Sequence, residues 1–404
     1  MSSSDDAPLK GIRILDLTRV VSGPFATMHL GDLGAEVAKI EQPEVGDESR
    51  AYGPPFVGGE SPYFLSVNRN KRGCAIDLKS AAGKELMIRL ASVADVMVEN
   101  FRPGTLERLG LGYDVLSHDH AGLILCSITG FGRSGPDANR AGYDLILQGE
   151  SGIMDITGEP DGAPTKVGAS IADMVTGLYA TQAILAALLR RERTGRGARL
   201  DIAMLDSMAS FLTFNAGIYF TTGQSPKRRG NAHPTISPYE PFETADGWIN
   251  IGVANDRLWK IFCPAIGRAD LLDNPKFLKA PDRVTNRLAL RDELAPVFRA
   301  STRQHWCSVL GKAGVPFGEI KSVGEVCETP QLTSRGVIRQ FEHPKAGAVK
   351  YIASPVRFDD RPPPDAMRAP LIGEHTFEVL AGWLGIDGSE FDRYAQQGAF
   401  GPTQ

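Results

Sequence analysis

The sequence has few of the features that mark disulfide-rich, metal-binding or membrane proteins. Its five cysteines lie at positions 74, 126, 263, 307 and 327, and no two of them have CxxC spacing. An odd number of widely spaced cysteines disfavours a disulfide framework and a zinc site, and is typical of reduced thiols in a cytoplasmic protein. The longest apolar run, residues 183–189, is too short to cross a bilayer.

Signals for export and for nucleotide binding are also missing. The N-terminal segment MSSSDDAPLKG is polar and acidic, so we expect neither a secretory signal nor a basic transit peptide. No GxGxxG motif follows the first expected strand and no Walker A motif is present, which disfavours a dinucleotide cofactor and phosphoryl transfer. The net charge of -4 gives no basis for binding nucleic acid or an anionic membrane. We therefore expect a cytoplasmic protein with neither kind of partner.

The first half of the chain alternates short apolar strands with helices. Strands are predicted over 12–15, 36–41, 95–99 and 123–128, and helices are predicted to begin at Pro24 and to cover 80–94. Strands separated by helices of about 10–15 residues indicate βαβ units and a parallel sheet. We predict a doubly wound, Rossmann-like α/β domain, whose ligands bind beyond the C-terminal ends of the strands.

The composition changes in the second half. Residues 223–241 are rich in glycine, proline and basic residues, which is typical of a linker or an active-site loop. A strand over 247–254 and helices over 255–265, 281–299 and 302–313 predict a smaller α+β domain at about 225–325. Strands at 337–342 and 349–352 and a helix starting near residue 374 complete the chain. Without other information, we interpret two basic clusters as solvated loops: Arg69, Lys71 and Arg72, and Lys227, Arg228 and Arg229.

One carboxylate stands out because of its position. Asp173 lies in the first turn of an apolar helix predicted over 170–191, where an unpaired buried charge would be costly. Ser170 and Asp173 have the spacing of a capping box, which is the simpler interpretation. The functional interpretation uses the same helix start: backbone N–H groups and the helix dipole would keep Asp173 ionised as a nucleophile. Residues alone leave both interpretations open.

Six motifs in order carry a resemblance to a known family. They are LDLTRVVSGPFAT, LGAEVAKIEQP, NRNKRG, DVMVENFRPG, SITGFGRSGP and APLIGEHT, and they extend from about residue 15 to 376. Together they resemble the class III, or formyl-CoA transferase-like (CaiB/BaiF), CoA transferases. Within that family, Asp173 matches the aspartate that attacks the donor acyl-CoA. The resemblance implies an aspartyl mixed anhydride and then an aspartyl-CoA thioester, with CoA or acyl-CoA as substrate, no metal and no permanently bound cofactor.

The resemblance also implies which residues contact CoA. Val21 and Ser22 follow the first strand, although a related group of enzymes has glutamine at the position of Val21. The other implied CoA contacts are Ile76, Asp77, Leu78, Lys79, Asn100, Phe101, Arg102, Arg108, Arg140 and Tyr143. Arginine and lysine suit the phosphates of CoA. For Lys79 and Arg108, simple surface solvation is the alternative.

Two alternatives to a transferase remain. The α-methylacyl-CoA racemases resemble this sequence, but they have a histidine where Tyr143 stands in the Ala141–Asp144 motif, so racemase chemistry would lack its acid/base group here. A non-catalytic CoA-binding protein, in which Asp173 is only a capping residue, is the other alternative.

The stretch 229–239 and the strings LDLTRV, GPPFVG and SVNRNK are similar to those of glutarate, succinate–hydroxymethylglutarate and itaconate CoA transferases. This likeness indicates the class of substrate. These transferases act on dicarboxylates of four to six carbons, commonly with succinyl-CoA as donor. A second carboxylate needs a cationic or hydrogen-bonding pocket. The candidates for substrate binding are Arg50, Asp144, Arg229, His233 and Thr235, although His233 could equally be a loop histidine bonded to backbone.

The family also implies a quaternary structure and a division into domains. We expect an interlocked homodimer in which each large domain joins N- and C-terminal segments. The expected parts are a large CoA-binding domain over 1–200, a linker helix over 201–224, a small domain over 225–325 and a return segment over 326–404.

Overall fold

The computed structural model describes residues 6–401 and divides into two compact units. Unit 1 contains the described residues up to Ile153, Lys166–Ala216 and the described residues from Pro330 onward. Unit 2 contains Met154–Thr165 and Gly217–Thr329. Unit 1 therefore joins N- and C-terminal segments of the chain. The short stretch 154–165 belongs to unit 2, and no sequence pattern predicted this assignment.

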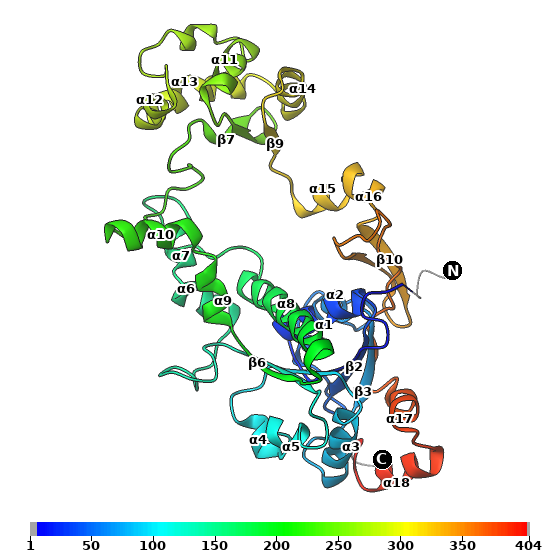
Figure 1. The fold of residues 1–404 in the computed structure, drawn as a ribbon. Helices are drawn as coiled ribbons and strands as arrows, with labels where there is room; N and C mark the ends of the chain where they lie inside the picture. Colours follow the sequence, from blue (N-terminus) through cyan, green and yellow to red (C-terminus); the bar gives the residue numbers. More distant parts are fainter. Residues whose placement is uncertain (1–5, 402–404) are drawn as a thin grey trace. The chain divides into compact units, whose positions relative to one another are not determined.

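Unit 1 is built on a six-stranded, wholly parallel sheet with the strand order β3-β2-β1-β4-β5-β6 (Figure 1). This confirms the predicted parallel α/β fold, and it is the strand order of a Rossmann-like sheet. Four strands lie where the sequence predicted them, whereas β3 and β6 were missed because charged residues interrupt their apolar pattern. The strands are β1 (Arg13–Asp16), β2 (Glu36–Glu41), β3 (Lys71–Ala75), β4 (Val96–Glu99), β5 (Ile124–Thr129) and β6 (Ala198–Ala203).

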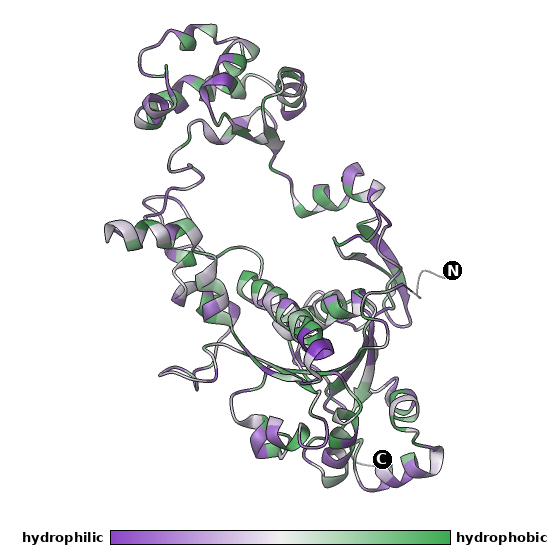
Figure 2. Ribbon diagram, viewed as in Figure 1, coloured by the Kyte–Doolittle hydropathy of each residue, from purple (hydrophilic) through white to green (hydrophobic). Residues whose placement is uncertain are grey.

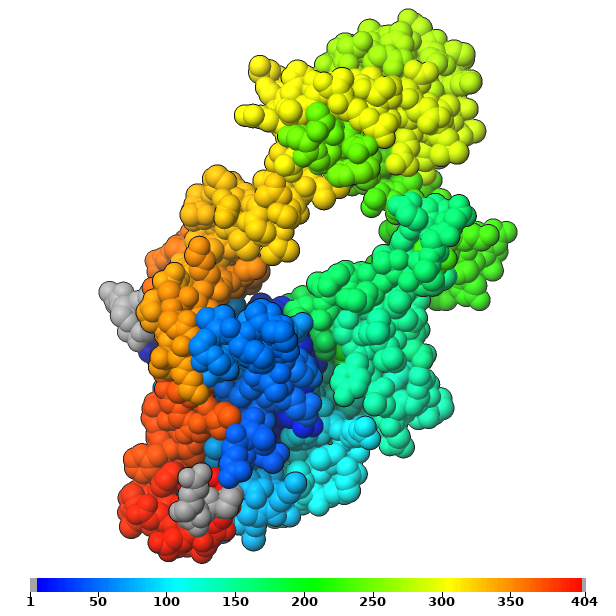
Figure 3. All heavy atoms as spheres, turned by 180° about the vertical axis from the view of Figure 1, so that it is seen from behind, coloured from blue at the N-terminus to red at the C-terminus, as the bar shows by residue number. Residues whose placement is uncertain are grey.

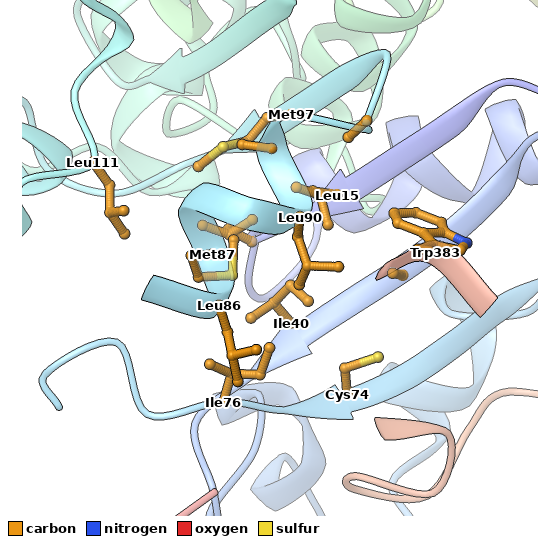
Figure 4. Close-up of a cluster of buried hydrophobic side chains, with 14 of the residues drawn as sticks. Leu15, Ile40, Cys74, Ile76, Leu86, Met87, Leu90, Met97, Leu111 and Trp383 are labelled. Atoms are coloured by element: carbon orange, nitrogen blue, oxygen red, sulfur yellow. The ribbon is translucent and has the colours of Figure 1, made fainter. Parts of the chain in front are cut away.

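Helices cover both faces of this sheet. On one face α1 and α8 pack over Ile14, Val37 and Ile124. On the other face α3 and α17 enclose a cluster that includes Leu15, Ile40 and Trp383 (Figure 4). The helices of unit 1 and its borders are α1 (Ser22–Asp32), η1 (Glu48–Ala51), α2 (Pro62–Val67), α3 (Ala81–Ala91), α4 (Thr105–Leu109), α5 (Tyr113–Leu116), α6 (Asp144–Glu150), α7 (Ile153–Ile156), α8 (Ile171–Thr194), α9 (Met204–Ser210), α10 (Thr213–Thr222), α16 (Pro330–Ser334), α17 (Thr376–Leu384) and α18 (Gly388–Gln396).

Some helix ends follow their sequence signals and one does not. Ser80 caps α3 by accepting a hydrogen bond from the Gly83 N–H, and Gly195 ends α8 in a left-handed conformation, both as predicted. The helix expected to begin at Pro24 begins two residues earlier, at Ser22. Ser22 is therefore part of α1 and not of the preceding loop.

The C-terminal segment protects the edge strand β3. The His375 N–H donates to the Gly73 carbonyl and the Ala75 N–H donates to the Thr376 hydroxyl. A Cβ at Gly73 would lie 2.5 Å from the Leu371 carbonyl oxygen, so the close approach requires glycine there. Seen from behind in Figure 3, the C-terminal residues lie directly against the N-terminal part of unit 1. An edge strand covered in this way is not free to pair with another chain. A hairpin of β10 (Ile338–His343) and β11 (Gly347–Ile352) precedes this segment.

Unit 2 has its own sheet and core. Strands β7 (Tyr239–Thr244), β8 (Gly247–Gly252) and β9 (Phe317–Glu319) pair antiparallel, and their apolar face packs with Trp259, Phe262 and Phe298. Its helices are α11 (Asp256–Ala265), η2 (Ala269–Leu272), α12 (Ala280–Thr285), α13 (Arg287–Arg299), α14 (Arg303–Ala313) and α15 (Val323–Cys327).

Helix α8 differs from its sequence prediction. We expected burial all round, yet the exposed fraction is 50% at Leu178 and 60% at Leu189. By length and composition α8 could cross a membrane, but half of its apolar stretch is buried, and it packs on α1 and β5 as a core helix does. Figure 2 shows it as mostly hydrophobic or neutral before a hydrophilic C-terminal end. Some of its apolar surface thus stays uncovered in a single chain.

Candidate active site

The candidate site lies where the strand order of the sheet reverses. Strands β1 and β4 are neighbours, and their connections leave in opposite directions along the sheet. In open α/β sheets a crevice forms at this point, beyond the carboxyl ends of the strands. Here the segments that follow β1 and β4 meet: the Arg19 N–H donates to Asn100 Oδ1 at 2.9 Å, and Asn100 Nδ2 donates to the Arg19 carbonyl at 2.8 Å.

A cavity of about 190 Å³, called the Asp173 cavity, opens at this point. Nine of the residues predicted from the sequence line it: Val21, Ser22, Asn100, Phe101, Arg102, Arg140, Tyr143, Asp144 and Asp173. They come from the loops after β1, β4 and β5 and from the first turns of α1, α6 and α8. The fold thus brings together residues that are widely separated in sequence.

A larger cavity of about 700 Å³, called the Lys79 cavity, adjoins the first. It is lined by the predicted residues Ile76, Asp77, Leu78, Lys79 and Phe101. The two cavities share Arg19, Glu48 and Phe101 as lining residues. The volume lies within the range of sites for drug-sized ligands. Arg108 lines neither cavity; its guanidinium donates to the hydroxyl of Thr105, which does line the Lys79 cavity.

Several lining residues were not predicted. Arg19 and Glu48 form an ion pair at 2.7 Å where the two cavities meet, and the Arg19 guanidinium lies over the Phe101 ring. Arg19 stands inside one of the motifs that carried the resemblance, so its position was a usable signal. Tyr52 and Val45 had no such signal, because nothing in their sequence surroundings places them beside residues 76–79.

The start of α8 is capped by Asp144 and not by Ser170. The Ser170 side chain makes no capping hydrogen bond, so the predicted capping box is wrong. Instead Asp144 Oδ1 accepts from the Ala172 N–H at 2.9 Å, and Asp144 Oδ2 accepts from Gln148 at 2.8 Å. Because another carboxylate takes the capping role, the Asp173 side chain is free to face the cavity.

The environment of Asp173 changes its acidity. Burial and the nearby Asp144 carboxylate raise the pKa of Asp173 to about 7, although hydrogen bonding from the Ser22 hydroxyl and N–H acts in the opposite direction. We had expected the helix start to keep this carboxyl firmly ionised. The expectation is corrected, because desolvation and like-charge repulsion outweigh the donors. A pKa near neutrality is typical of groups that take part in chemistry.

Ser22 reaches Asp173 because α1 and α8 approach closely. Gly177 stands one turn after Asp173 in α8, and a Cβ there would lie 2.7 Å from the Ser22 carbonyl oxygen. A side chain at Gly23 would meet Thr18 at 2.3 Å. Gly177 therefore permits the contact between the helix starts, and Gly23 permits the start of α1 to lie against Thr18.

A buried network of charges lies beneath the loop after β1. Lys39 pairs with Asp47 and Lys71 pairs with Asp16, each at 2.9 Å, with all four side chains fully buried. Arg69, also buried, pairs with Asp32 at 2.6 Å. The interpretation of this basic cluster as a solvated loop is therefore wrong for Arg69 and Lys71. Their partners lie on distant segments, so the local sequence could not reveal the pairing.

The five residues predicted for substrate binding fall into different places. Asp144 lines the Asp173 cavity, whereas the Arg50 guanidinium is paired with the Glu41 carboxylate and lies 3.6 Å over the Phe64 ring. Arg229, His233 and Thr235 belong to unit 2, where the His233 ring accepts a hydrogen bond from the Thr235 N–H. A substrate role for these three residues stays a prediction, and the contacts of Arg50 favour a structural role.

The fold and the site define an α/β protein with a ligand-sized cavity at the point where the strand order reverses. The sequence model of CoA-transferase family III matches residues 9–376, and the chain belongs to this family. Succinyl-CoA:glutarate CoA-transferase of Homo sapiens is 42% identical over 380 residues, covering 94% of this chain and 87% of the relative. Succinate–glutarate CoA-transferase of Agrobacterium fabrum is 40% identical over 380 residues, covering 93% and 95%. The crystal structure of a CaiB/BaiF family protein from Brucella suis superposes with a TM-score of 0.86 at 41% identity, covering 93% of this chain and 99% of that one. The protein is thus a CoA-transferase.

Proposed function

We propose that this enzyme moves CoA from succinyl-CoA to a dicarboxylic acid of four to six carbons, with glutarate as the first acceptor to test. The observation that carries the proposal is the Asp173 carboxyl, which faces a small cavity that adjoins a larger one. The names of the relatives in Homo sapiens and Agrobacterium fabrum support succinate and glutarate as the exchanging acids.

In this proposal the Lys79 cavity holds the adenosine end and pantetheine arm of CoA, and the thioester lies in the Asp173 cavity. The mainly apolar wall that includes Ile76, Leu78 and Phe101 suits the adenine and the pantetheine. Lys79, Arg102 and Arg108 are the cations proposed for the phosphates. CoA and acyl-CoA are substrates, and no permanently bound cofactor is proposed.

The proposed chemistry is a sequence of acyl exchanges on one carboxylate. Ionised Asp173 attacks the thioester carbonyl of succinyl-CoA, CoA leaves as thiolate, and a mixed anhydride forms. The thiolate attacks the Asp173 acyl carbon, which releases succinate and leaves an aspartyl-CoA thioester. The acceptor carboxylate then displaces the thiolate to form a second anhydride. The thiolate finally attacks the acceptor's acyl carbon, so acceptor-CoA leaves and free Asp173 returns.

We also propose that the enzyme is a homodimer. Helix α10, which lies wholly within the described residues, has no buried residue although it carries four apolar aromatic or aliphatic side chains. Leu178 on α8, Phe211 and Phe214 are 47–58% exposed. Apolar patches of this kind commonly mark interfaces between proteins. We propose from the family resemblance that the two chains interlock. We also propose that the enzyme acts in the cytoplasm, because its five cysteines are free.

The Asp173→Asn variant tests the function. Asparagine keeps the size of the side chain but is not a carboxylate nucleophile, so we expect no glutaryl-CoA from succinyl-CoA and glutarate, measured by liquid chromatography. The matched control is Asp119→Asn at an exposed surface position, which should exchange CoA like the wild type. Exchange by Asp173→Asn at the wild-type rate would refute the mechanism.

Two further measurements separate the remaining alternatives. Hydroxylamine added during turnover should modify the peptide that contains Asp173, because an activated aspartyl group reacts with it. A panel of glutarate, itaconate, mesaconate, hydroxymethylglutarate and labelled succinate identifies the preferred acceptor. A wild-type protein that binds CoA but exchanges it with none of these acids would favour a CoA-binding protein without this activity.

A further inference from the structure

The turn Thr18–Val20, which leads from β1 into the Asp173 cavity, is held at nearly every backbone polar group. The Thr18 N–H donates to Asp16, and the Thr18 carbonyl accepts from Lys39 Nζ at 3.0 Å. The Arg19 N–H donates to Asn100 Oδ1, and the Arg19 carbonyl accepts from Asn100 Nδ2. The Val20 N–H donates to Asp47 Oδ1 at 3.1 Å. Side chains therefore pair five of the six backbone polar groups of this turn.

Val20 adopts a conformation that its residue type disfavours. Its φ is 68°, in the left-handed region, whereas its neighbour Val21 has φ -129°. A β-branched side chain at positive φ is a genuine outlier, and strain of this kind persists only where the surroundings impose it. Since Val20 lines the Asp173 cavity and stands two residues before Ser22, the strain lies directly beside the candidate chemistry.

Asp47 is the group best placed to impose this conformation. Its Oδ1 accepts from the Val20 N–H and from the N–H and hydroxyl of Ser49, while its Oδ2 accepts from Lys39 at 2.9 Å. The Asp47 N–H in turn donates to Glu41 at 2.9 Å. One fully buried carboxylate thus joins the turn of the Asp173 cavity to the η1 segment that lines the Lys79 cavity.

We propose that Asp47, supported by Lys39, is a positioning residue for CoA transfer: it holds Val20 in the left-handed conformation that directs Ser22 at the Asp173 carboxyl. The inference rests on the proposed role of Asp173. In this proposal a buried side-chain acceptor, which is not one of the reacting groups, aligns the donors that stabilise the nucleophile. Small misplacements of such donors are known to slow enzymes strongly.

The strain itself is tested without any activity, by matched glycine and alanine variants. Both substitutions at Val20 remove the two γ-methyl groups, but only glycine also lacks Cβ and adopts positive φ freely, so Val20→Gly should have a higher Tm than Val20→Ala. At Val21, with ordinary φ, the order should reverse and alanine should be the more stable. The same order at both positions would overturn the proposal.

The kinetic test uses Asp47→Ala. We expect kcat to fall about tenfold or more, because the turn relaxes and Ser22 moves from Asp173. The acidic limb of the pH profile should move to higher pH, since the Ser22 donors no longer oppose burial and Asp144. Adding Val20→Gly should restore much of kcat, whereas adding Val20→Ala should not. An unchanged kcat in folded Asp47→Ala, or equal rescue by both second substitutions, would overturn the proposal.

Two controls separate positioning from general damage. Asp32→Ala breaks a different buried carboxylate pair, with Arg69, at the far end of α1, and should lower Tm without moving the pH profile. Asp47→Asn keeps an acceptor for the Val20 N–H and should retain kcat within about threefold of wild type, a difference of about 0.7 kcal/mol; a loss as deep as that of alanine would overturn the proposal. If wild type exchanges no CoA, the proposed function fails, while the Tm order at Val20 and Val21 still tests the strained turn.

Discussion

At the scale of single residues, the site depends on two carboxyl groups with different tasks. Asp144 caps α8 through the Ala172 N–H and at the same time raises the pKa of Asp173 through its charge. Asp173 faces the cavity, and burial together with the Asp144 charge raises its pKa to about 7, far above the ordinary value for an aspartate. Once ionised, a carboxylate whose pKa is raised by desolvation is a stronger nucleophile than one that is stabilised by solvent or a cation.

The first residue-scale prediction concerns pH. Because the proposed mechanism needs ionised Asp173, kcat/KM for the proposed donor succinyl-CoA should rise with pH and level off above a midpoint near 7. Asp144→Asn removes the like charge, so the midpoint should move to lower pH. The measurement is a pH series of initial rates for both proteins. A midpoint that stays in place would show that burial alone sets the acidity of Asp173.

The second residue-scale prediction concerns stability. A carboxyl with a raised pKa in the folded state is destabilising when ionised, and this cost grows as pH rises from the unfolded value of 3.8 to about 7. Asp173→Asn should therefore raise Tm more at pH 8 than at pH 5, measured by thermal denaturation. The exposed control Asp119→Asn should show a much smaller difference. Equal shifts at both pH values for Asp173→Asn would contradict the raised pKa.

At the scale of elements, the site is produced by the contact of α1 with α8. The contact depends on Gly177, where a Cβ would lie 2.7 Å from the Ser22 carbonyl oxygen and 3.0 Å from the Phe25 ring. Both helices also bury apolar faces on the same side of the sheet, so their separation is set by packing over their whole length. One methyl group added at Gly177 should therefore change the distance between Ser22 and Asp173 at the starts of the two helices.

Gly177→Ala is the corresponding prediction. Overpacking should cost about 1–3 kcal/mol of stability and lower kcat, because Ser22 is pushed away from Asp173. Gly382→Ala in α17 is the matched control, since no atom lies within 4 Å of the added Cβ, and it should stabilise the protein slightly. Denaturant unfolding and initial rates measure both effects. Normal activity in Gly177→Ala would mean that Ser22 is not needed in its present position.

At the scale of the whole molecule, the uncovered apolar surface of α8 to α10 is the main unexplained feature of one chain. Leu178 and Phe214 are 50% and 58% exposed. Exposed apolar surface of this kind commonly marks a contact with another protein chain. The proposed homodimer accounts for this surface. In contrast, the edge strand β3 is already covered by the C-terminal segment, so extension of the sheet at this edge is not the expected mode of association.

Leu178→Asp and Phe214→Asp test the dimer. Each places a charge in the proposed interface, so the mass measured by light scattering should fall from that of two chains to that of one. Asp119→Asn, at an exposed position outside this surface, should leave the mass unchanged. A wild-type protein that is monomeric, or a dimer that both aspartate variants leave intact, would contradict this interface.

The sequence by itself determined the parallel α/β class, the position of β1, β2, β4 and β5, and the presence of Asp173 at the start of a long helix. These features follow from local periodicity, from caps such as Ser80 and from motifs in a fixed order. The tertiary structure alone decided that Asp144 caps α8, that Lys71 is buried, and that Asp47 holds Val20. Each of these depends on which distant segments meet in space. The tertiary structure also decided the pKa of Asp173, because its burial and the nearby Asp144 charge depend on how distant segments pack and not on the neighbouring sequence.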